Sequence, residues 1–238
     1  MISLIIPSFN EEKNLTKLFD KLELTLNENP DENIEIIIVD NGSTDGSSKL
    51  IREHKLFLSN KLKLLNIKKN IGYGDGINQG INFSKGDVIC WFHADLQFDP
   101  QDAIKIYKKF KASLLKDEIF VKGKRVNRNL FDEFFTFGMS LFTLFLFKKK
   151  INDINAQPKI FNRSFLKLIS DPPLDFSYDI YFLLIASKNN IKIIESPVNW
   201  SNRNAGLAKG GGSLKLKIKL TLRTLKFMFE LKKRLKWK

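Results

Sequence analysis

Three side chains that could bind a divalent cation follow a short apolar run near the middle of the chain. His93, Asp95 and Gln97 occupy alternate positions after residues 88–92. If the chain stays extended there, an imidazole, a carboxylate and an amide oxygen face the same side. Oxygen ligands suit Mg²⁺ or Mn²⁺, which also keep waters and substrate phosphates in their coordination shells. The segment therefore predicts a cation site, with capping of the helix near Pro100 as the alternative.

Two other polar loops also follow apolar runs. Asn10 and Glu11 come soon after Pro7, which ends the first run, and Asp40 ends the second run, before a cluster of turn-forming residues. A carboxylate at such a place can accept hydrogen bonds from a base N–H or from a ribose hydroxyl. The alternative is that Asn10 caps a helix with Glu11 in its first turn, and that Asp40 only starts a turn. The two loops together favour nucleotide binding.

A third loop, residues 70–80, contains four glycines. Glycines allow positive φ values and a close approach of the backbone to a phosphate or a sugar, and we expect Gly72 to have this role. The spacing matches neither a P-loop nor the dinucleotide fingerprint, so this loop alone is weak evidence.

The apolar runs before these loops predict strands, and residues with helical spacing lie between them. Strands that alternate with helices indicate an α/β fold with a mostly parallel central sheet flanked by helices. The carboxyl ends of such strands meet at one edge, so the polar loops should gather there. The predicted strands are residues 2–6, 34–39, 62–67, 88–92 and 119–121, and the later predicted helices are residues 104–115 and one or two helices within Leu130–Phe147.

Length and composition indicate one domain with a short extension. The chain has 238 residues, 43% of them hydrophobic, which suffices for one well-packed core. The glycines at 210–212 mark a boundary between a domain at residues 1–209 and a basic C-terminal helix at residues 210–238. Cys90, the single cysteine, lies in an apolar run, which predicts an inert, buried thiol. The N-terminus shows no signal-peptide pattern, so a cytoplasmic location is expected.

Positive charge is concentrated at the C-terminal end. The net charge of +14 favours polyanions such as nucleic acid, anionic lipid headgroups or phosphorylated small molecules, and residues 206–238 hold eleven basic residues against Glu230. Leu130–Phe147 contains seven of the 21 phenylalanines and precedes lysines at 148–150. This segment and the tail suit shallow insertion at an anionic bilayer, the alternative being a pair of core helices. The charge-free residues 134–147 are too few to span a bilayer.

The order of these motifs resembles the family-2 glycosyltransferases with a GT-A fold, in particular the dolichol-phosphate mannose synthase-like branch. The similarity covers nearly the whole chain and is weakest across residues 130–150. Its N-terminal signatures are residues 5–11, 38–46 and 86–97, and further matches are residues 123–125, residues 153–161, Tyr178 with Asp179, and residues 197–200, followed by Arg203, Gly206 and Lys209.

The resemblance implies a donor site for a nucleotide sugar such as a UDP- or GDP-sugar. Pro7, Glu11 and Asp40 would hold its base and ribose. Together with the residues considered above, the expected donor site consists of Pro7, Asn10, Glu11, Asp40, Gly72 and Asp95.

The resemblance also implies a metal on the diphosphate of the donor. Asp95 and Gln97 would bind this Mg²⁺ or Mn²⁺ ion, with His93 as a third candidate ligand. Relatives usually carry Asp at the position of His93, so a single carboxylate remains in the motif. The cation and nearby basic residues would neutralise the departing nucleotide diphosphate.

The expected acceptor is a polyprenyl phosphate. The family inverts configuration by direct displacement, and an ionised phosphate needs no strong base. The resemblance implies that Arg125 contacts a phosphate of the donor or acceptor, and that Arg203 and Lys209 grip the acceptor phosphate. A saccharide hydroxyl would instead need a base, for which Asp179 is the candidate. The expected catalytic residues are therefore Asp95, Arg125 and Asp179.

The chain is accordingly expected to be an inverting hexosyltransferase, bound peripherally to the inner face of the cell membrane. Its expected partners are the nucleotide-sugar donor, the acceptor and an anionic membrane surface, without nucleic acid. Transfer to a saccharide hydroxyl in cell-surface polysaccharide synthesis is the alternative within the class. From other classes, the basic tail suits a nucleic-acid-binding protein, and His93 suits a nucleotide-sugar-binding module without catalysis. The sugar, the base and the oligomeric state stay open.

Overall fold

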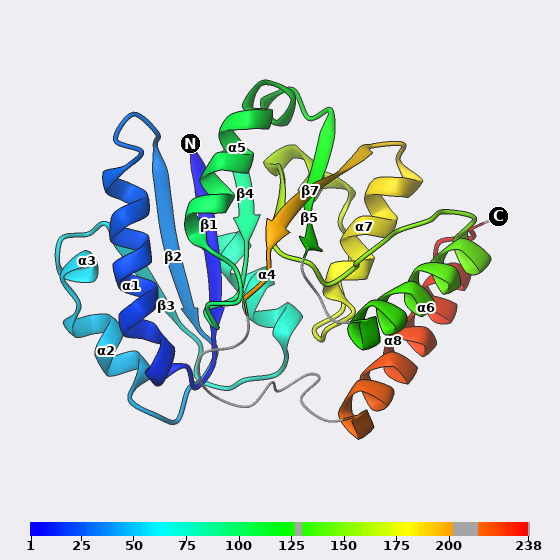
Figure 1. Ribbon diagram of the computed structural model, residues 1–238, viewed down its shortest axis with the longest axis horizontal. Coiled ribbons are helices and arrows are strands. Elements are labelled where there is room, and N and C mark those ends of the chain that lie inside the picture. Colours follow the sequence, from blue (N-terminus) through cyan, green and yellow to red (C-terminus); the bar gives the residue numbers. More distant parts are fainter. Residues whose placement is uncertain (127–129, 202–213, 238) are drawn as a thin grey trace.

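The computed structural model of the chain describes residues 1–126, 130–201 and 214–237, and it has a central sheet between layers of helices (Figure 1). The sheet contains seven strands in the order β3-β2-β1-β4-β6-β5-β7. Within this sheet β6 is antiparallel to both of its neighbours, and the other pairs are parallel. The predicted mostly parallel α/β fold is confirmed. The strands are β1 Ile2–Ser8, β2 Ile34–Asp40, β3 Leu62–Asn66, β4 Val88–Trp91, β5 Ile119–Val126, β6 Lys159–Asn162 and β7 Lys192–Asn199.

The register of the strands places the ends of β1, β2 and β4 at one edge. Ser8 of β1 pairs with Asp40 of β2, and Ile5 pairs with Trp91 of β4. These strands are nearly continuous apolar runs because helices cover both of their faces. The loops that follow them therefore begin side by side.

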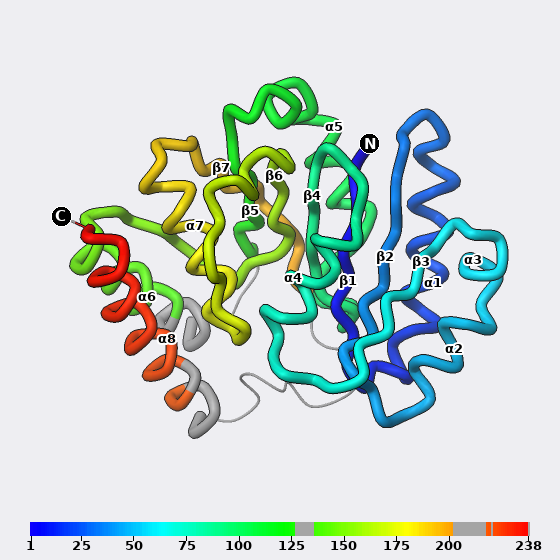
Figure 2. The backbone as a smooth tube through the Cα atoms, turned by 180° about the vertical axis from the view of Figure 1, so that it is seen from behind, coloured from blue at the N-terminus to red at the C-terminus, as the bar shows by residue number. Residues whose placement is uncertain are grey.

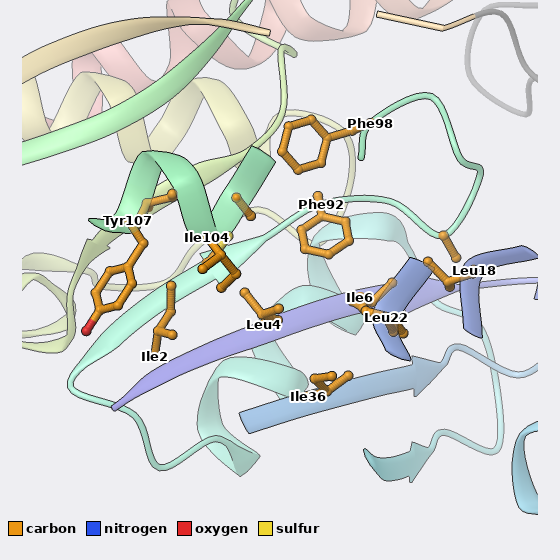
Figure 3. Packing of buried hydrophobic residues seen from close by; sticks show 14 of the residues in the cluster. Ile2, Leu4, Ile6, Leu18, Leu22, Ile36, Phe92, Phe98, Ile104 and Tyr107 are labelled. Carbon is orange, nitrogen blue, oxygen red and sulfur yellow. The ribbon is translucent and has the colours of Figure 1, made fainter. Parts of the chain in front are cut away.

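Helices cover the sheet on both faces. Helices α1, α2 and α5 pack on one face, while α4 and α7 pack on the other. Alternate residues of β1 serve the two cores, since Leu4 points to α1 and α5 and Ile5 points to α4 (Figure 3). The helices are α1 Glu12–Asn27, α2 Ser47–Glu53, α3 Lys55–Leu58, α4 Tyr73–Phe83, α5 Pro100–Leu115, α6 Leu130–Phe147, α7 Tyr178–Lys188 and α8 Leu214–Arg234, with a 3₁₀ helix at Arg163–Leu168.

The Phe-rich segment and the basic tail form two helices that pack together. In both views α6 and α8 lie beside one another next to α7 (Figures 1 and 2). Met228 and Leu231 of α8 are buried in the core that α7 also contributes to. The Trp237 indole donates to the carbonyl oxygen of Phe147 at 2.9 Å. The tail is therefore helical, as predicted, and the predicted boundary at residues 210–212 lies outside the described residues.

In the described part of the chain, the helices are all too short or too polar to cross a bilayer. Cys90 is completely buried in β4, and this burial raises the pKa of its thiol far above the usual value. The expectation of an inert thiol agrees with this environment.

Candidate functional site

The loops after β1 and β2 are tied to each other by hydrogen bonds. The backbone N–H of Asn10 donates to Ser43 Oγ at 3.0 Å, and the N–H of Thr44 donates back to Asn10 Oδ1 at 2.7 Å. The N–H of Glu11 donates to Ser47 Oγ at 3.1 Å. Asn10 takes a positive φ of 54°, which turns the chain so that these bonds can form. The two predicted nucleotide loops thus form one unit.

Glu11 and Asp40 are buried carboxylates within this unit. Asp40 is 1% exposed, and its Oδ1 accepts from the backbone N–H of Ser43 at 2.9 Å. Glu11 is 9% exposed, and its Oε2 accepts from Asn14 Nδ2 at 2.6 Å. Such bonds fix the orientation of both carboxylates. Pro7 lies just before the end of β1, beside Val39 of β2.

The second loop is bonded to the third, and two glycines of the third loop pack closely against other parts of the chain. Asn41 Nδ2 donates to the carbonyl oxygen of Gly72 at 2.9 Å. A Cβ on Gly72 would lie 2.0 Å from the carbonyl oxygen of Leu174, and one on Gly74 would lie 2.4 Å from that of Pro173. Most of residues 70–80 belongs to α4, and these two glycines allow the start of that helix to pack closely on the chain before α7. The close approach of Leu174 therefore accounts for a glycine at position 72.

The third loop is bonded in turn to the fourth. The Tyr73 hydroxyl lies 3.2 Å from His93 Nε2, and the two rings stack with centroids 5.1 Å apart. Gln157 Nε2 lies 3.1 Å from the same His93 nitrogen. Nε2 of His93 is therefore engaged by Tyr73 and Gln157.

The prediction that residues 93, 95 and 97 share an extended face is wrong. Strand β4 ends at Trp91, and the chain then turns, with Leu96 at a φ of 62°. The turn directs His93 to Tyr73 and Gln157, whereas Asp95 and Gln97 stay together because the N–H of Gln97 donates to Asp95 Oδ1 at 3.2 Å. His93 therefore does not share a face with Asp95 and Gln97.

Gln97 connects Asp95 to the end of β7. With its amide nitrogen turned toward Asp95, Gln97 donates to Asp95 Oδ2 at 3.1 Å and accepts from the Trp200 indole N–H at 3.2 Å. The N–H of Ser201 donates to the backbone carbonyl of Gln97 at 3.1 Å. Asp95 itself is 7% exposed. Residues that directly follow β7 therefore help to form the site.

Arg125 lies at the other side of Trp200. Its guanidinium stands over the Trp200 ring, 5.0 Å from the centroid, and it forms a bidentate ion pair with Asp153 through Nε and Nη2. The backbone N–H of Arg125 also donates to Asp153 at 2.9 Å. The arginine expected at a phosphate is thus held by a carboxylate and a ring.

Asp179 lies in the interior behind His93. Its side chain is 4% exposed and accepts from the Trp91 indole at 3.1 Å, and its Oδ1 lies 3.4 Å from Nζ of the buried Lys159. Its other oxygen accepts from the Tyr73 hydroxyl at 3.3 Å. Burial, followed by the charge of Asp179, raises the pKa of Tyr73 well above its usual value, so Tyr73 stays a hydroxyl donor. Both oxygens of the buried Asp179 carboxylate therefore already accept hydrogen bonds.

Comparison with known proteins identifies the family. The family model described as glycosyl transferase family 2 matches residues 3–170. The chain belongs to glycosyl transferase family 2. The family predicted from the motifs is therefore confirmed, and this chain is a glycosyltransferase.

Relatives of this glycosyltransferase include enzymes named for dolichyl phosphate. It is 26% identical over 231 residues to the dolichyl-phosphate beta-glucosyltransferase ALG5C of Trichomonas vaginalis, which covers 91% of this chain and 68% of that protein. It is 29% identical over 223 residues to the dolichyl-phosphate beta-glucosyltransferase of Homo sapiens, with coverage of 84% and 67%.

A solved structure has the same fold. Glucosyl-3-phosphoglycerate synthase from Mycobacterium tuberculosis, in complex with Mn²⁺, UDP and glucosyl-3-phosphoglycerate, superposes with a TM-score of 0.69. The match has 15% sequence identity and covers 94% of this chain and 77% of that one. At this identity the similarity establishes the fold, which is the predicted GT-A fold.

The donor set for a cation in this glycosyltransferase is small. Within the described ranges, no three His, Cys, Asp or Glu side chains converge on one point. Asp95 and Gln97 nevertheless bring a carboxylate oxygen and an amide end within 3.1 Å of each other. Adjacent oxygen ligands of an octahedral Mg²⁺ are separated by about 3 Å, given metal–oxygen distances of about 2.1 Å. Among the described residues, this pair would fit one edge of such a site.

The structure brings most of the predicted site residues to one edge of the sheet. Arg203 and Lys209 lie outside the described residues. The sequence interpretation gave no role to Tyr73, Lys159 or Trp200, which connect the site to its surroundings. A lysine within the apolar strand β6 was the available signal for Lys159.

Proposed function

We propose that this glycosyltransferase transfers a sugar, with inversion, from a nucleoside diphosphate sugar to a polyprenyl phosphate. The observation that carries the proposal is that the loops after the first four strands are hydrogen-bonded in series, through Asn10, Asn41 and Tyr73. This series gathers Glu11, Asp40 and Asp95 at one edge of the sheet. The two dolichyl-phosphate glucosyltransferases above support the class of acceptor, and the chain spans about two thirds of their length.

The donor nucleotide is assigned to the unit formed by the first two loops. Asp40 and Glu11 are buried and oriented, so they can accept hydrogen bonds from a ribose hydroxyl or a base N–H without losing further side-chain entropy. Pro7, Asn10 and Gly72 shape this unit rather than supply charge.

A divalent cation is assigned to Asp95 and Gln97. Bound there, Mg²⁺ or Mn²⁺ would supply electrostatic stabilisation of the departing nucleotide diphosphate. The Mn²⁺ and UDP in the structural neighbour support this assignment. His93 stands outside this pair, because its Nε2 is engaged by Tyr73 and Gln157.

The burial of Asp179 and its ion pair with Lys159 favour a phosphate acceptor over a hydroxyl acceptor. A hydroxyl must lose a proton to a base during transfer, whereas a phosphate oxygen is already ionised. Asp179, the candidate base, is buried and is the counterion of the buried Lys159. In our proposal Arg125, Arg203 and Lys209 bind phosphate oxygens, and alignment of the two substrates supplies much of the rate. For Arg125 this requires a phosphate to compete with Asp153.

The acceptor lipid is expected at the surface formed by α6 and α8. Phe137, Leu141 and Phe145 are exposed on α6 at helical spacing, and Phe145 is 80% exposed. Ile218 and Leu222 form a similar exposed stripe on α8. Apolar stripes of this kind beside Lys and Arg side chains suit shallow insertion at an anionic bilayer.

The proposal is tested by ligand-induced stabilisation followed by transfer. UDP-, GDP- and dTDP-sugars with Mn²⁺ or Mg²⁺ should raise the melting temperature for one nucleotide class. The same donor should then glycosylate undecaprenyl or dolichyl phosphate. Asp95→Asn should lower turnover by about 100-fold or more, while Asp102→Asn on α5 should leave it unchanged. Stabilisation by a donor with transfer only to saccharide hydroxyls would refute the acceptor, and no stabilisation by any donor would refute the proposal as a whole.

A further inference from the structure

A half-turn of the Gln97 side-chain amide would exchange its nitrogen and its oxygen, and the two resulting settings would have different partners. In the first, Nε2 donates to Asp95 Oδ2 at 3.1 Å and Oε1 accepts from the Trp200 indole at 3.2 Å. In the second, Nε2 would lie 3.4 Å from the carbonyl oxygen of Ser201 and could donate to it, and Oε1 would take the place beside Asp95. The two settings therefore exchange a nitrogen for an oxygen at the point where Asp95 faces Gln97.

Charge decides which setting is stable. Without a cation, the second setting would place an amide oxygen against a carboxylate oxygen and an amide N–H₂ against the indole N–H, and both contacts are repulsive. With a cation beside Asp95, the oxygen of Gln97 would serve as a ligand and its nitrogen would exchange Asp95 for the Ser201 carbonyl as partner. We therefore expect the first setting in the cation-free protein and the second in the loaded one.

Trp200 is well placed to hold the first setting. The Arg125 guanidinium lies over its ring at 5.0 Å, and Arg125 is itself fixed by two bonds from its side chain to Asp153. The indole is therefore oriented from one face, and its N–H points to the Gln97 amide.

We propose that Trp200 is a positioning residue that holds Gln97 in its cation-free setting, and that cation binding beside Asp95 turns this amide over. The inference rests on the cation site of the proposed function. It makes an unusual prediction, because removing a hydrogen-bond donor next to the site should tighten cation binding. The indole competes with the cation for the same amide oxygen.

The test compares Mn²⁺ binding, measured by electron paramagnetic resonance of free Mn²⁺, in single and double variants. Trp200→Phe keeps a ring under Arg125 and removes the N–H, so Mn²⁺ should bind about two- to tenfold more tightly, the range expected for one lost hydrogen bond. Trp237→Phe is the matched control, since its N–H bonds the Phe147 carbonyl, and it should bind Mn²⁺ like the wild type. In a Gln97→Glu background, Trp200→Phe should have less than a twofold effect, because a carboxylate offers an oxygen in both settings. Unchanged or weaker binding by Trp200→Phe, or equal tightening in the Gln97→Glu background, would overturn the inference.

A second measurement needs no substitution in the protein under test. The chain has three tryptophans, whose indole N–H signals can be resolved by nuclear magnetic resonance and assigned with the Phe variants. Addition of Mg²⁺ should shift the Trp200 signal as its hydrogen bond is lost, and leave the Trp91 and Trp237 signals in place. If Mg²⁺ binds and the Trp200 signal does not move, this inference fails alone. If the wild type binds neither Mg²⁺ nor Mn²⁺, with or without UDP, the proposed cation site fails and the inference fails with it.

Discussion

Lys159 of β6 and Asp179 of α7 form an ion pair in the interior, with 3.4 Å between Nζ and Oδ1 and at most 4% of either side chain exposed. Burial lowers the pKa of Lys159, and the charge of Asp179 opposes that shift. Asp179 also accepts from Trp91 and Tyr73, while Lys159 donates to the carbonyl oxygen of Ala156 at 2.8 Å. Through these contacts the ion pair connects β6 to Tyr73, whose ring stacks on His93.

Loss of the carboxylate charge should destabilise the protein strongly. Asp179→Asn leaves the ammonium of Lys159 without a counterion in the interior, which we expect to lower the free energy of unfolding by about 3–5 kcal/mol. Urea denaturation at pH 7 measures the change. Glu53→Gln, in the exposed pair with Lys49 at 3.9 Å, is the control and should cost less than about 1 kcal/mol. A loss as small as the control's would show that Asp179 carries no essential charge.

Lys122 should make stability depend on pH. Burial lowers the pKa of this lysine from 10.5 to about 8, with Glu195 at 3.6 Å opposing the shift. Between these two values the unfolded chain binds more protons than the folded one, so stability rises with pH. Lys122→Met lacks this dependence. Its stability relative to the wild type should therefore fall by about 3 kcal/mol between pH 7 and pH 10.5.

Unfolding in urea at several pH values measures this difference. Lys17→Met on the exposed side of α1 is the control, and its stability relative to the wild type should not change across the same range. A difference between Lys122→Met and the wild type that stays constant with pH would contradict the prediction.

Gly72 and Gly138 should respond in opposite ways to alanine. A Cβ on Gly72 would lie 2.0 Å from the Leu174 carbonyl oxygen, so the backbone must move and we expect a loss of about 2 kcal/mol or more. Gly138, in α6, has nothing within 4 Å of such a Cβ, and alanine there should stabilise the helix by up to about 1 kcal/mol. Thermal melts of the two variants measure both effects. Equal melting temperatures would refute the close approach at Gly72.

Aspartate at position 93 should not restore a stronger cation site. His93→Asp removes the stack on Tyr73 and the contacts of Nε2 with Tyr73 and Gln157, so the free energy of unfolding should fall by about 1–3 kcal/mol. The affinity for Mn²⁺ should stay within threefold of the wild-type value, on the order of one weak contact. Mn²⁺ titration provides the measurement. Tightening by more than about tenfold would mean that position 93 reaches the cation after all.

Phe145 should contribute to vesicle binding without contributing to stability. Its side chain is 80% exposed on α6, so Phe145→Ser should lower binding to phosphatidylglycerol vesicles by about tenfold and leave the melting temperature unchanged. Phe83→Ser on α4, at a residue that is 42% exposed, is the control and should bind vesicles like the wild type. Equal vesicle binding by both variants would contradict a role of Phe145 in membrane binding.

The first half of the fold could be predicted because its strands are apolar runs with turn residues after them. The ends of β1 and β2 extend the predicted runs by only one or two residues. In β6 the pattern fails, since this strand of four residues begins with a lysine. The burial of Lys159 depends on its ion pair with Asp179. That partner comes from another element and cannot be read from local sequence.

Within the site, the residue types could be predicted but some of their orientations could not. Asp95 and Gln97 stay together as expected, whereas the positive φ of Leu96 removes the common face with His93. Leu96 gave no local sign of this turn, because positive φ is uncommon for leucine and is set by its surroundings. The burial of Asp179 likewise depends on tertiary packing, since the first turn of a helix is a common position for an exposed carboxylate.

The serial bonding of the strand-end loops limits how donor preference can be altered in this enzyme. Thr44 is anchored to Asn10, Asn41 to Gly72 and Tyr73 to His93. Grafting one of these segments from a homologue with a different nucleotide would remove partners from its neighbour. Chimeras that exchange all of these segments together should keep their geometry. Donor specificity should therefore be changed by replacing the whole set of strand-end loops, not one loop at a time.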